Sequence, residues 1–350
     1  MKASYKKYIL DFKRPSGTSR GVLVQKETWF LILQKNGKLG IGECGLFRGL
    51  SVDDVFCYEE KLQWTCDHIN LGKDKLWQEL VEFPSIQFGV EQAFLSLKSD
   101  NPFKLFPSSF TEKERHITIN GLIWMGDKGF MFEQIQQKLE AGFSCIKMKI
   151  GAIDFKAEVK LLADIRKRFS KEEIEIRVDA NGAFAPKEAL EKLQVLSNFD
   201  LHSIEQPIKQ GNHLKMSELC DKTPLPIALD EELIGVFGVR KKEKLLQTIQ
   251  PQYIILKPSL VGGFKGSEEW IAIAEKHAIA WWVTSALESN IGLNAISQWT
   301  FTLENTMPQG LGTGNLYTNN FESPLTAEKG YIYYHLKKKW MANLIQELCI

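Results

Sequence analysis

Two lysines stand two residues apart in the segment CIKMKIG, which runs from Cys145 to Gly151. The β-branched and apolar residues around them indicate a buried strand, in which Lys147 and Lys149 point to the same face. Lysine is among the residues that are least often fully buried. The face is therefore either wet, or it holds the lysines for chemistry, since desolvation lowers the pKa of an ammonium group toward the range of a general base.

Four further apolar runs also end in an ionisable residue. The sequences RVD, SIE, IALD and IILK end in Asp179, Glu205, Asp230 and Lys257. In a barrel of parallel strands the carboxyl ends lie on one face, and that face carries the loops that bear catalytic groups. A helix cap or a surface charge explains any one of these carboxylates equally well, but three in succession favour a shared site.

Three carboxylates that meet at one barrel mouth repel one another unless positive charge lies between them. A hard divalent cation that prefers oxygen ligands, most simply Mg²⁺, meets this need and leaves coordination sites for a substrate carboxylate. Lys149 and Lys257 lie on the strands that flank the three carboxylates, so they would face each other across the metal. Such a site can remove a proton α to a carboxylate and stabilise the resulting enediolate. For Lys257, a structural salt bridge is the alternative.

The elements that must position these residues alternate along the chain from His116 onward. Short apolar runs are separated by longer amphipathic stretches, which favours a parallel α/β sheet, and a closed (β/α)8-type barrel fits better than an open sheet. Strands are expected within 116–124, 145–150, 175–182, 201–207, 226–232, 253–259, 278–289 and 309–315, and helices within 129–141, 155–169, 186–196 and 268–277.

The part of the chain before His116 has a different pattern. Apolar runs on either side of Asn36-Gly37 predict an antiparallel hairpin, because both turn positions tolerate positive φ. Residues 15–21 and 45–50 contain glycine and are expected to form loops. A helical region is expected from Ser51 to about residue 98, with Asp54 completing a capping box.

A segment rich in proline and phenylalanine, 101–110, suggests a domain boundary. We therefore expect an N-terminal α+β domain at residues 1–112 and a modified barrel at 113–325. Residues 329–340 alternate again and are expected to return to the N-terminal sheet, so that 326–350 forms a C-terminal segment of that domain.

Charge and cysteine content exclude several classes of protein. The 44 basic and 43 acidic residues give a formal net charge of +1, which provides no general field for nucleic acid or an anionic membrane. The six cysteines form no CxxC pair, and neither a signal peptide nor a membrane span is evident. We expect a cytoplasmic protein whose partner is a small-molecule carboxylate substrate; a homo-oligomer is compatible with the sequence.

Five short motifs at the strand ends resemble, in their order, those of the enolase superfamily, specifically its muconate-lactonizing subgroup. They are KMK, RVDANG, IEQP, PIALDEE and LKPS. The resemblance covers nearly the whole chain and implies an α+β capping domain beside the barrel, with loops 17–21 and 45–50 closing over the substrate. It implies that Lys149 is the acid/base, that Lys257 acts from the opposite face and that Glu231 supports the site. The Mg²⁺ ligands that it implies are Asp179, Glu205 and Asp230.

Within the subgroup, ECGLFRGLS, TSALESNIGL and GLGTG are most similar to the lyases that form o-succinylbenzoate in menaquinone (vitamin K2) biosynthesis. The similarity implies Mg²⁺-dependent syn-dehydration of a succinyl-hydroxycyclohexadiene carboxylate. Lys149 would remove the α-proton and assist departure of hydroxide, while Lys257 contributes a cation near the ring. Lys147 would pair with a carboxylate or lower the pKa of Lys149, and it joins the candidates for substrate binding. Ser285 and Thr313 are candidates for binding the succinyl carboxylate, although ordinary loop turns explain them equally well.

Three other readings remain open at this stage. A dipeptide epimerase or N-acylamino acid racemase would use both lysines as acid/base, but GLGTG lacks the acidic residue that dipeptide enzymes tend to carry there. A Schiff-base aldolase would need a buried lysine, yet it gives no reason for three aligned carboxylates. A catalytically inactive barrel that binds a ligand is opposed by the intact set of ionisable groups.

Overall fold

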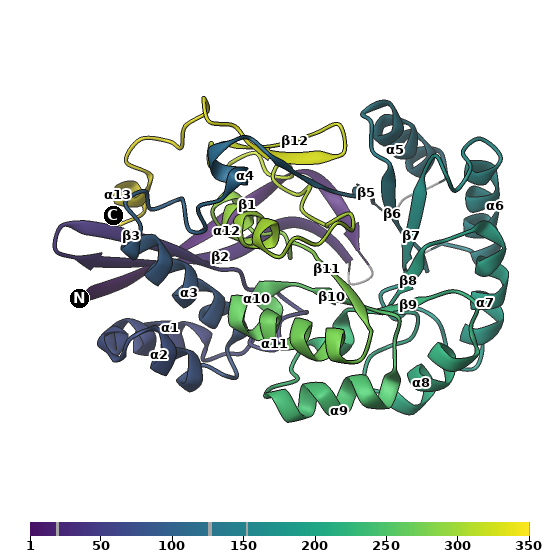
Figure 1. The fold of residues 1–350 in the computed structure, drawn as a ribbon, viewed down its shortest axis with the longest axis horizontal. Coiled ribbons are helices and arrows are strands. Elements are labelled where there is room, and N and C mark those ends of the chain that lie inside the picture. Colours follow the sequence, from purple (N-terminus) through teal and green to yellow (C-terminus); the bar gives the residue numbers. More distant parts are fainter. Residues whose placement is uncertain (19–20, 125–127, 152, 350) are drawn as a thin grey trace.

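The computed structural model describes residues 1–18, 21–124, 128–151 and 153–349. Its strands form three sheets, which are an antiparallel β1-β2-β3 sheet, a parallel sheet in the order β11-β10-β9-β8-β7-β6-β5, and a small β12-β13-β4 sheet. The parallel sheet curls with its helices outside, and the antiparallel sheet lies across its open side (Figure 1). None of the described helices is long and apolar enough to span a membrane.

The N-terminal sheet consists of β1 (Lys2–Thr18), β2 (Gly21–Lys35) and β3 (Lys38–Cys44). The predicted hairpin is confirmed, because Asn36 and Gly37 join β2 to β3 with φ values of 50° and 75°, as a tight turn of this type requires. The loop predicted at 15–21 is wrong as far as Thr18, because β1 continues to that residue after an irregularity in its pairing. Residues 19–20 lie outside the described part.

The helices α1 (Tyr58–Asp67) and α3 (Pro84–Lys98) pack on this sheet, and α2 (Lys73–Glu79) packs against α3. The short 3-10 helix η1 (Ile69–Leu71) lies between α1 and α2 in the sequence. The backbones of β3 and α3 approach so closely that a Cβ atom on Gly42 would lie 1.9 Å from the carbonyl oxygen of Gly89. Glycine is therefore required at position 42 by space rather than by backbone conformation.

The helix predicted to begin after Ser51 begins at Tyr58 instead. The Ser51 hydroxyl accepts a hydrogen bond from the backbone N–H of Phe47 at 2.8 Å, and the Asp54 carboxylate accepts one from the N–H of Gly49 at 2.7 Å. Both side chains thus stabilise the loop at 45–50. The predicted capping box is wrong because these residues cap a loop and not a helix.

The parallel sheet follows the chain order, and each strand pairs with its neighbours in sequence. Its eighth position is filled by a short bridge, since Gln309 pairs with Ile119 and Gly310 with Thr284. The predicted α/β fold with a (β/α)8-type barrel and a capping domain is confirmed, with its eighth strand reduced to this bridge. The strands are β5 (Gly121–Ile123), β6 (Cys145–Lys149), β7 (Glu175–Asp179), β8 (Ser203–Glu205), β9 (Ile227–Leu229), β10 (Tyr253–Leu256) and β11 (Ala280–Val283).

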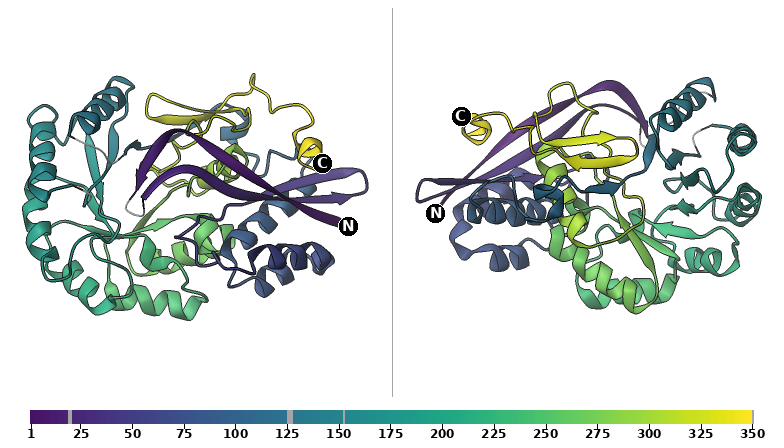
Figure 2. Two further views of the ribbon diagram at one scale, coloured as in Figure 1. Left: turned by 180° about the vertical axis from the view of Figure 1, so that it is seen from behind. Right: turned by 45° about the horizontal axis from the view of Figure 1, so that its top comes forward.

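Helices follow the strands and cover the outer face of the curled sheet (Figure 2). The helices expected at 129–141, 155–169, 186–196 and 268–277 are present with shifted ends. The barrel helices are α5 (Lys128–Glu140), α6 (Phe155–Arg166), α7 (Ala189–Leu196), α8 (His213–Lys222), α9 (Val239–Ile249), α10 (Pro258–Val261), α11 (Gly263–Lys276) and α12 (Asn290–Thr302), and two 3-10 helices, η2 (Ser197–Phe199) and η3 (Glu231–Leu233), accompany them.

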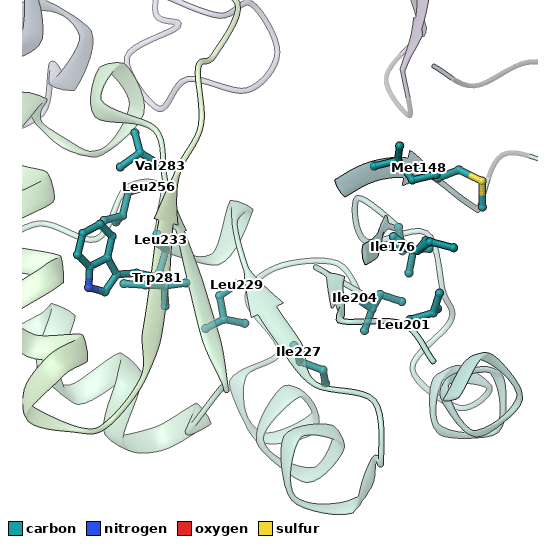
Figure 3. Close-up of a cluster of buried hydrophobic side chains, with 14 of the residues drawn as sticks. Met148, Ile176, Leu201, Ile204, Ile227, Leu229, Leu233, Leu256, Trp281 and Val283 are labelled. Carbon is teal, nitrogen blue, oxygen red and sulfur yellow. The ribbon is translucent and has the colours of Figure 1, made fainter. Parts of the chain in front are cut away.

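Alternation along the barrel strands separates apolar residues that face the helices from an inner face that carries both apolar and ionisable residues. Outward residues such as Met148, Ile204 and Leu229 join the large core between sheet and helices, and Figure 3 shows them following one another around the sheet. Ala228 and Ile255 belong to a separate small cluster of buried side chains. Because residues two apart share a face, Ala228 and Asp230 lie on the same side of the sheet, as do Ile255 and Lys257.

The C-terminal hairpin does not join the N-terminal sheet as predicted. Its strands β12 (Leu325–Glu328) and β13 (Tyr331–Tyr334) pair with each other, and β13 pairs with β4 (His116–Thr118) beside the barrel. The helix α13 (Leu344–Leu348) instead packs against the N-terminal sheet, in a cluster with Phe30 and Ile41. A further short helix, α4 (Ser109–Glu112), precedes β4. We propose that the chain divides into a capping domain at residues 1–112, a barrel at 113–325 and a C-terminal segment at 326–350.

Candidate active site

Five ionisable residues predicted from the sequence come from five adjoining strands. Lys149, Asp179 and Glu205 are the last residues of β6, β7 and β8, and Asp230 and Lys257 directly follow β9 and β10. The strand register pairs Lys149 with Asp179 and Asp179 with Glu205. Their side chains therefore project to the same face at the same height, as the alternation of the strands predicts.

Lys147 lies between two of the carboxylates. Its ammonium group is 2.9 Å from Asp179 Oδ2 and also forms an ion pair with Glu205 Oε2, which confirms that this lysine pairs with a carboxylate. Burial opposes the charged form of Lys147, but Asp179, Glu205 and Asp230 together raise its pKa. Burial alone therefore does not set the charge of this lysine, and it is held as a cation.

Two oxygen acceptors hold the side-chain nitrogen of Lys149. Its Nζ lies 3.2 Å from Asp179 Oδ2 and 2.6 Å from Asn181 Oδ1. Asn181 has a left-handed backbone with φ 43°, which asparagine tolerates better than most residues, and its amide donates to Glu231 Oε1 at 3.0 Å. Asn181 was missed among the predicted site residues, although its place in RVDANG was a signal for it. Glu231 thus contacts the site through Asn181.

Lys257 stands on the other side of the carboxylates. Its ammonium group forms an ion pair with Asp230 and lies 4.0 Å from Glu205 Oε1. Burial opposes its charged form, but the carboxylates of Asp230 and Glu205 raise its pKa. The ion pair considered as an alternative for Lys257 is therefore present, and it is part of the same cluster.

The chemistry of the three carboxylates fits Mg²⁺. Asp179, Glu205 and Asp230 are each at most 2% exposed, and they supply the hard oxygen donors that this ion prefers. Within the described ranges no hydrogen-bond donor reaches Glu205 Oε1, and burial followed by the charge of Asp179 raises the pKa of Glu205. The described residues include no ready-made group of three acidic, imidazole or thiol metal ligands; the carboxylates contact the lysine ammonium groups instead.

A buried glutamine fixes the spacing of two of these carboxylates. Gln206, at 0% exposure, accepts hydrogen bonds at 3.3 Å from the backbone N–H groups of Asp230 and Glu232. Its amide donates at 3.0 Å to the carbonyl of Ile208 and to Glu232 Oε2. The end of β8, which carries Glu205, is thereby joined to the turn after β9. The motifs IEQP and DEE contain both partners, but the sequence did not show that they meet.

A cavity of about 140 Å³ opens above this cluster and is lined by Lys147, Lys149, Lys257 and Asp179. Both predicted substrate-binding hydroxyl residues also line it, as do residues from the loop at 45–50 that was expected to cover the substrate. In the predicted loop at 17–21, residues 17–18 belong to β1 and Gly21 begins β2, while residues 19–20 lie outside the described part. Lining residues that were not predicted include Asn120, Leu122, Trp124, Lys138 and Phe143.

The hydroxyl groups of Ser285 and Thr313 line the cavity, but both are engaged in hydrogen bonds. Ser285 donates to Glu288 Oε2 at 2.6 Å and accepts from the N–H of Leu287 at 3.0 Å. Thr313 donates to the Ser285 oxygen at 3.0 Å. The sequence suggested that these hydroxyls donate to a succinyl carboxylate. To do so, they would have to give up the hydrogen bonds that they donate to Glu288 and Ser285.

Comparison with known proteins agrees with the fold. Residues 131–337 match the family described as enolase C-terminal domain-like. An o-succinylbenzoate synthase from Desulfotalea psychrophila is 47% identical over 363 aligned residues, which cover 95% of this chain and 98% of that one. The crystal structure of MenC from Desulfotalea psychrophila LSv54 has a TM-score of 0.85 and 43% identity, and the match covers 95% of this chain and 99% of that one.

More distant structures share the architecture. A dipeptide epimerase from Enterococcus faecalis V583, solved in complex with Mg and the dipeptide L-Leu-L-Tyr, gives a TM-score of 0.81 at 16% identity, covering 95% of this chain and 96% of that one. At this identity the likeness shows the fold alone. The family match over residues 131–337 and the relative of nearly equal length lead to one conclusion. The chain belongs to the enolase C-terminal domain-like family, within the enolase superfamily that its ordered strand-end motifs indicate.

Proposed function

We propose that this protein is an o-succinylbenzoate synthase, a hydro-lyase that dehydrates a succinyl-hydroxycyclohexadiene carboxylate in menaquinone biosynthesis in the cytoplasm. The observation that carries the proposal is the placement of Lys149 and Lys257 on either side of three buried carboxylates at one cavity. The similarity to a protein of this name along 95% of the chain supports the choice of substrate.

Asp179, Glu205 and Asp230 would hold Mg²⁺, which when bound supplies positive charge close to the negative charge that develops on the substrate carboxylate. The other steps belong to the side chains. Lys149, as a free amine, takes the α-proton while Asp179 and Asn181 hold its nitrogen in place.

The same lysine completes the dehydration. The electron pair of the broken C–H bond forms the enediolate and then the ring double bond, as the C–O bond breaks and hydroxide leaves. Lys149, now protonated, gives its proton to that hydroxide, so water departs from the face that lost the proton. Lys257 stays paired with Asp230 and remains a fixed cation on the opposite face.

The proposal is tested by incubating the purified protein with Mg²⁺ and the succinyl-cyclohexadiene substrate. We expect the absorbance of an aromatic product to appear, and to be lost in Lys149→Ala. Absence of any absorbance change with the wild-type protein would refute the assignment.

An epimerase is the second candidate, because Lys257 also lines the cavity and a dipeptide epimerase has the same fold. In an epimerase both lysines exchange protons, so Lys257→Ala and Lys149→Ala would be equally inactive. Deuterium uptake from heavy water into a dipeptide substrate would favour this candidate. The segment 310–314 offers no acidic residue for a substrate amino group, which favours dehydration.

A further inference from the structure

The buried carboxylate of Glu288 lies behind the wall of the cavity and has no part in the proposed mechanism. Glu288 is 0% exposed, and its two oxygens accept hydrogen bonds from Ser259 at 2.5 Å and from Ser285 at 2.6 Å. Ser285 in turn accepts from Thr313 at 3.0 Å. One carboxylate therefore joins the loops that follow β10, β11 and the eighth-strand bridge.

The hydrogen bond between Glu288 and Ser259 lies close to Lys257 in the sequence. Ser259 lies in α10, a short helix that begins with Pro258 directly after Lys257. A hydrogen bond from the Ser259 hydroxyl to Glu288 ties this turn to the loop of Ser285. The position of the Lys257 backbone relative to the cavity wall thus depends on Glu288.

The capping domain contacts the same carboxylate. A Cβ atom on Gly45, the first residue of the loop at 45–50, would lie 3.1 Å from Glu288 Cγ and 3.3 Å from Ser259 Cβ. Lys26 of β2 is 7% exposed, and its ammonium group has no hydrogen-bond partner among the described residues. Burial lowers the pKa of Lys26, whereas the nearby carboxylates of Glu43 and Glu288 act to raise it.

Glu43 extends the contact to the helix that follows this loop. It accepts hydrogen bonds from the backbone N–H of Ser289 at 2.9 Å, from the Ser289 hydroxyl at 2.5 Å and from the N–H of Gly292 at 2.9 Å. Strand β3 of the capping domain therefore holds the start of α12. The segment between Ser285 and Ser289 is therefore held by hydrogen bonds to both domains, to Ser259 of the barrel and to Glu43 of the capping domain.

We propose that Glu288 is a positioning residue that fixes Ser285, Thr313 and the turn of Lys257 relative to one another. Ser285 and Thr313 then form a wall in which the Thr313 hydroxyl donates to Ser285 and the Ser285 hydroxyl donates to Glu288, so neither proton is directed to the substrate. The inference rests on the proposed dehydration, because the wall belongs to the cavity of that reaction.

A buried glutamate can also serve packing alone, and Glu91 provides a matched control. Glu91 is 4% exposed and accepts hydrogen bonds from the backbone N–H groups of Phe264 at 2.6 Å and Lys265 at 3.2 Å. It joins a capping-domain helix, α3, to a barrel helix, α11. Neither Glu91 nor its two partners line the cavity, whereas Ser285, a partner of Glu288, does.

The test compares E288Q with E91Q by thermal unfolding and by steady-state dehydration with Mg²⁺. A glutamine at 288 accepts from one serine and presents N–H to the other, so the Ser285 hydroxyl must turn. We expect both variants to unfold at a lower temperature, but E288Q alone to change KM or kcat by about tenfold or more, since small misplacements near a reacting centre are costly. In the S285A background the E288Q effect on KM should shrink to less than half.

S259A is a second variant that removes one hydrogen bond without changing charge, should E288Q fail to fold. It is expected to lower kcat with little effect on KM, because it loosens the turn of Lys257. If E288Q and S259A keep KM and kcat within about twofold of the wild type, as E91Q does, the positioning role is overturned. An inactive wild-type protein would overturn both this inference and the proposed dehydration.

Discussion

The hydrogen bonds of Gln206 lead to a measurable prediction about metal binding. Replacing Gln206 with leucine keeps a similar volume but removes four hydrogen bonds, and it leaves Ile208, Asp230 and Glu232 with unsatisfied buried groups. Each such group costs about 1–3 kcal/mol. Because the two bonds to backbone N–H groups are long at 3.3 Å, we take the low end of this range for the four groups and expect a loss of about 4 kcal/mol of unfolding free energy.

We also expect Gln206→Leu to weaken Mg²⁺ binding, in addition to its effect on the unfolding free energy. Gln206 joins the strand end of Glu205 to the turn of Asp230, so its loss lets these two carboxylates move apart. Replacing a residue that orients metal ligands typically weakens metal binding by about 10- to 100-fold. That range corresponds to about 1.4–2.8 kcal/mol of binding free energy.

Gln298 is a matched control for this substitution. It is also 0% exposed and makes four hydrogen bonds, accepting from the backbone N–H groups of Leu105 and Phe106 and donating to Phe103 and Asn294. None of these partners belongs to the carboxylate cluster. Gln298→Leu should therefore cost similar stability and leave Mg²⁺ affinity unchanged.

The assay is calorimetric titration of Mg²⁺ into each folded variant, with denaturant unfolding measured in parallel. The reasoning predicts that Q206L and Q298L lose comparable stability while Q206L alone binds Mg²⁺ more weakly. If the Mg²⁺ affinity of Q206L stays within about twofold of that of Q298L, the glutamine does not hold the ligands and the argument fails.

Three further predictions follow from other contacts. In dehydration assays Lys149→Ala should lose about 10³-fold or more in rate, as expected for removal of a general base, whereas Lys257→Ala should retain measurable turnover; equal inactivity would contradict the fixed-cation role. Gly42→Ala should cost at least about 1–3 kcal/mol in denaturant unfolding, because its Cβ would overlap Gly89 O at 1.9 Å. Burial raises the pKa of Glu91 from 4.5 to about 7, so the folded state holds the proton longer and stability should fall as pH rises from about 4.5 to 7; E91Q should flatten that part of the profile.

The strand ends of the site could be predicted because each one couples a short apolar run to a single charge. Period-two alternation placed Lys147 and Lys149 on one face, and the order of the motifs placed Asp179, Glu205 and Asp230 on successive strands. These are local features, and the parallel register carries them directly into space. The ionisable cluster could therefore be predicted from the sequence. The hydrogen bonds of Asn181 and Gln206 that support it could be identified only in the structure.

Features that depend on long-range contacts were missed or wrong. Asn181 and Gln206 bind partners such as Lys149 and Glu232 that are distant in the sequence, and the sequence does not show which partner each side chain meets. Ser51 and Asp54 have the spacing of a helix cap, but nearby backbone N–H groups in the loop compete for the same oxygens. The alternating segment 329–340 was correctly expected to contain a strand, but its partner is β4, since alternation fixes a strand and not its neighbour.

The seam of the barrel, where Gln309 and Gly310 bridge Ile119 and Thr284, closes late during synthesis on the ribosome. The edge beside β5 is closed by Gln309 and Gly310, and the adjoining β4 is paired by β13. Both partners follow the rest of the barrel in the sequence. Until they emerge, the nascent sheet has an open edge, and open edges readily pair with other chains. Association with other chains during synthesis should therefore concentrate at this seam.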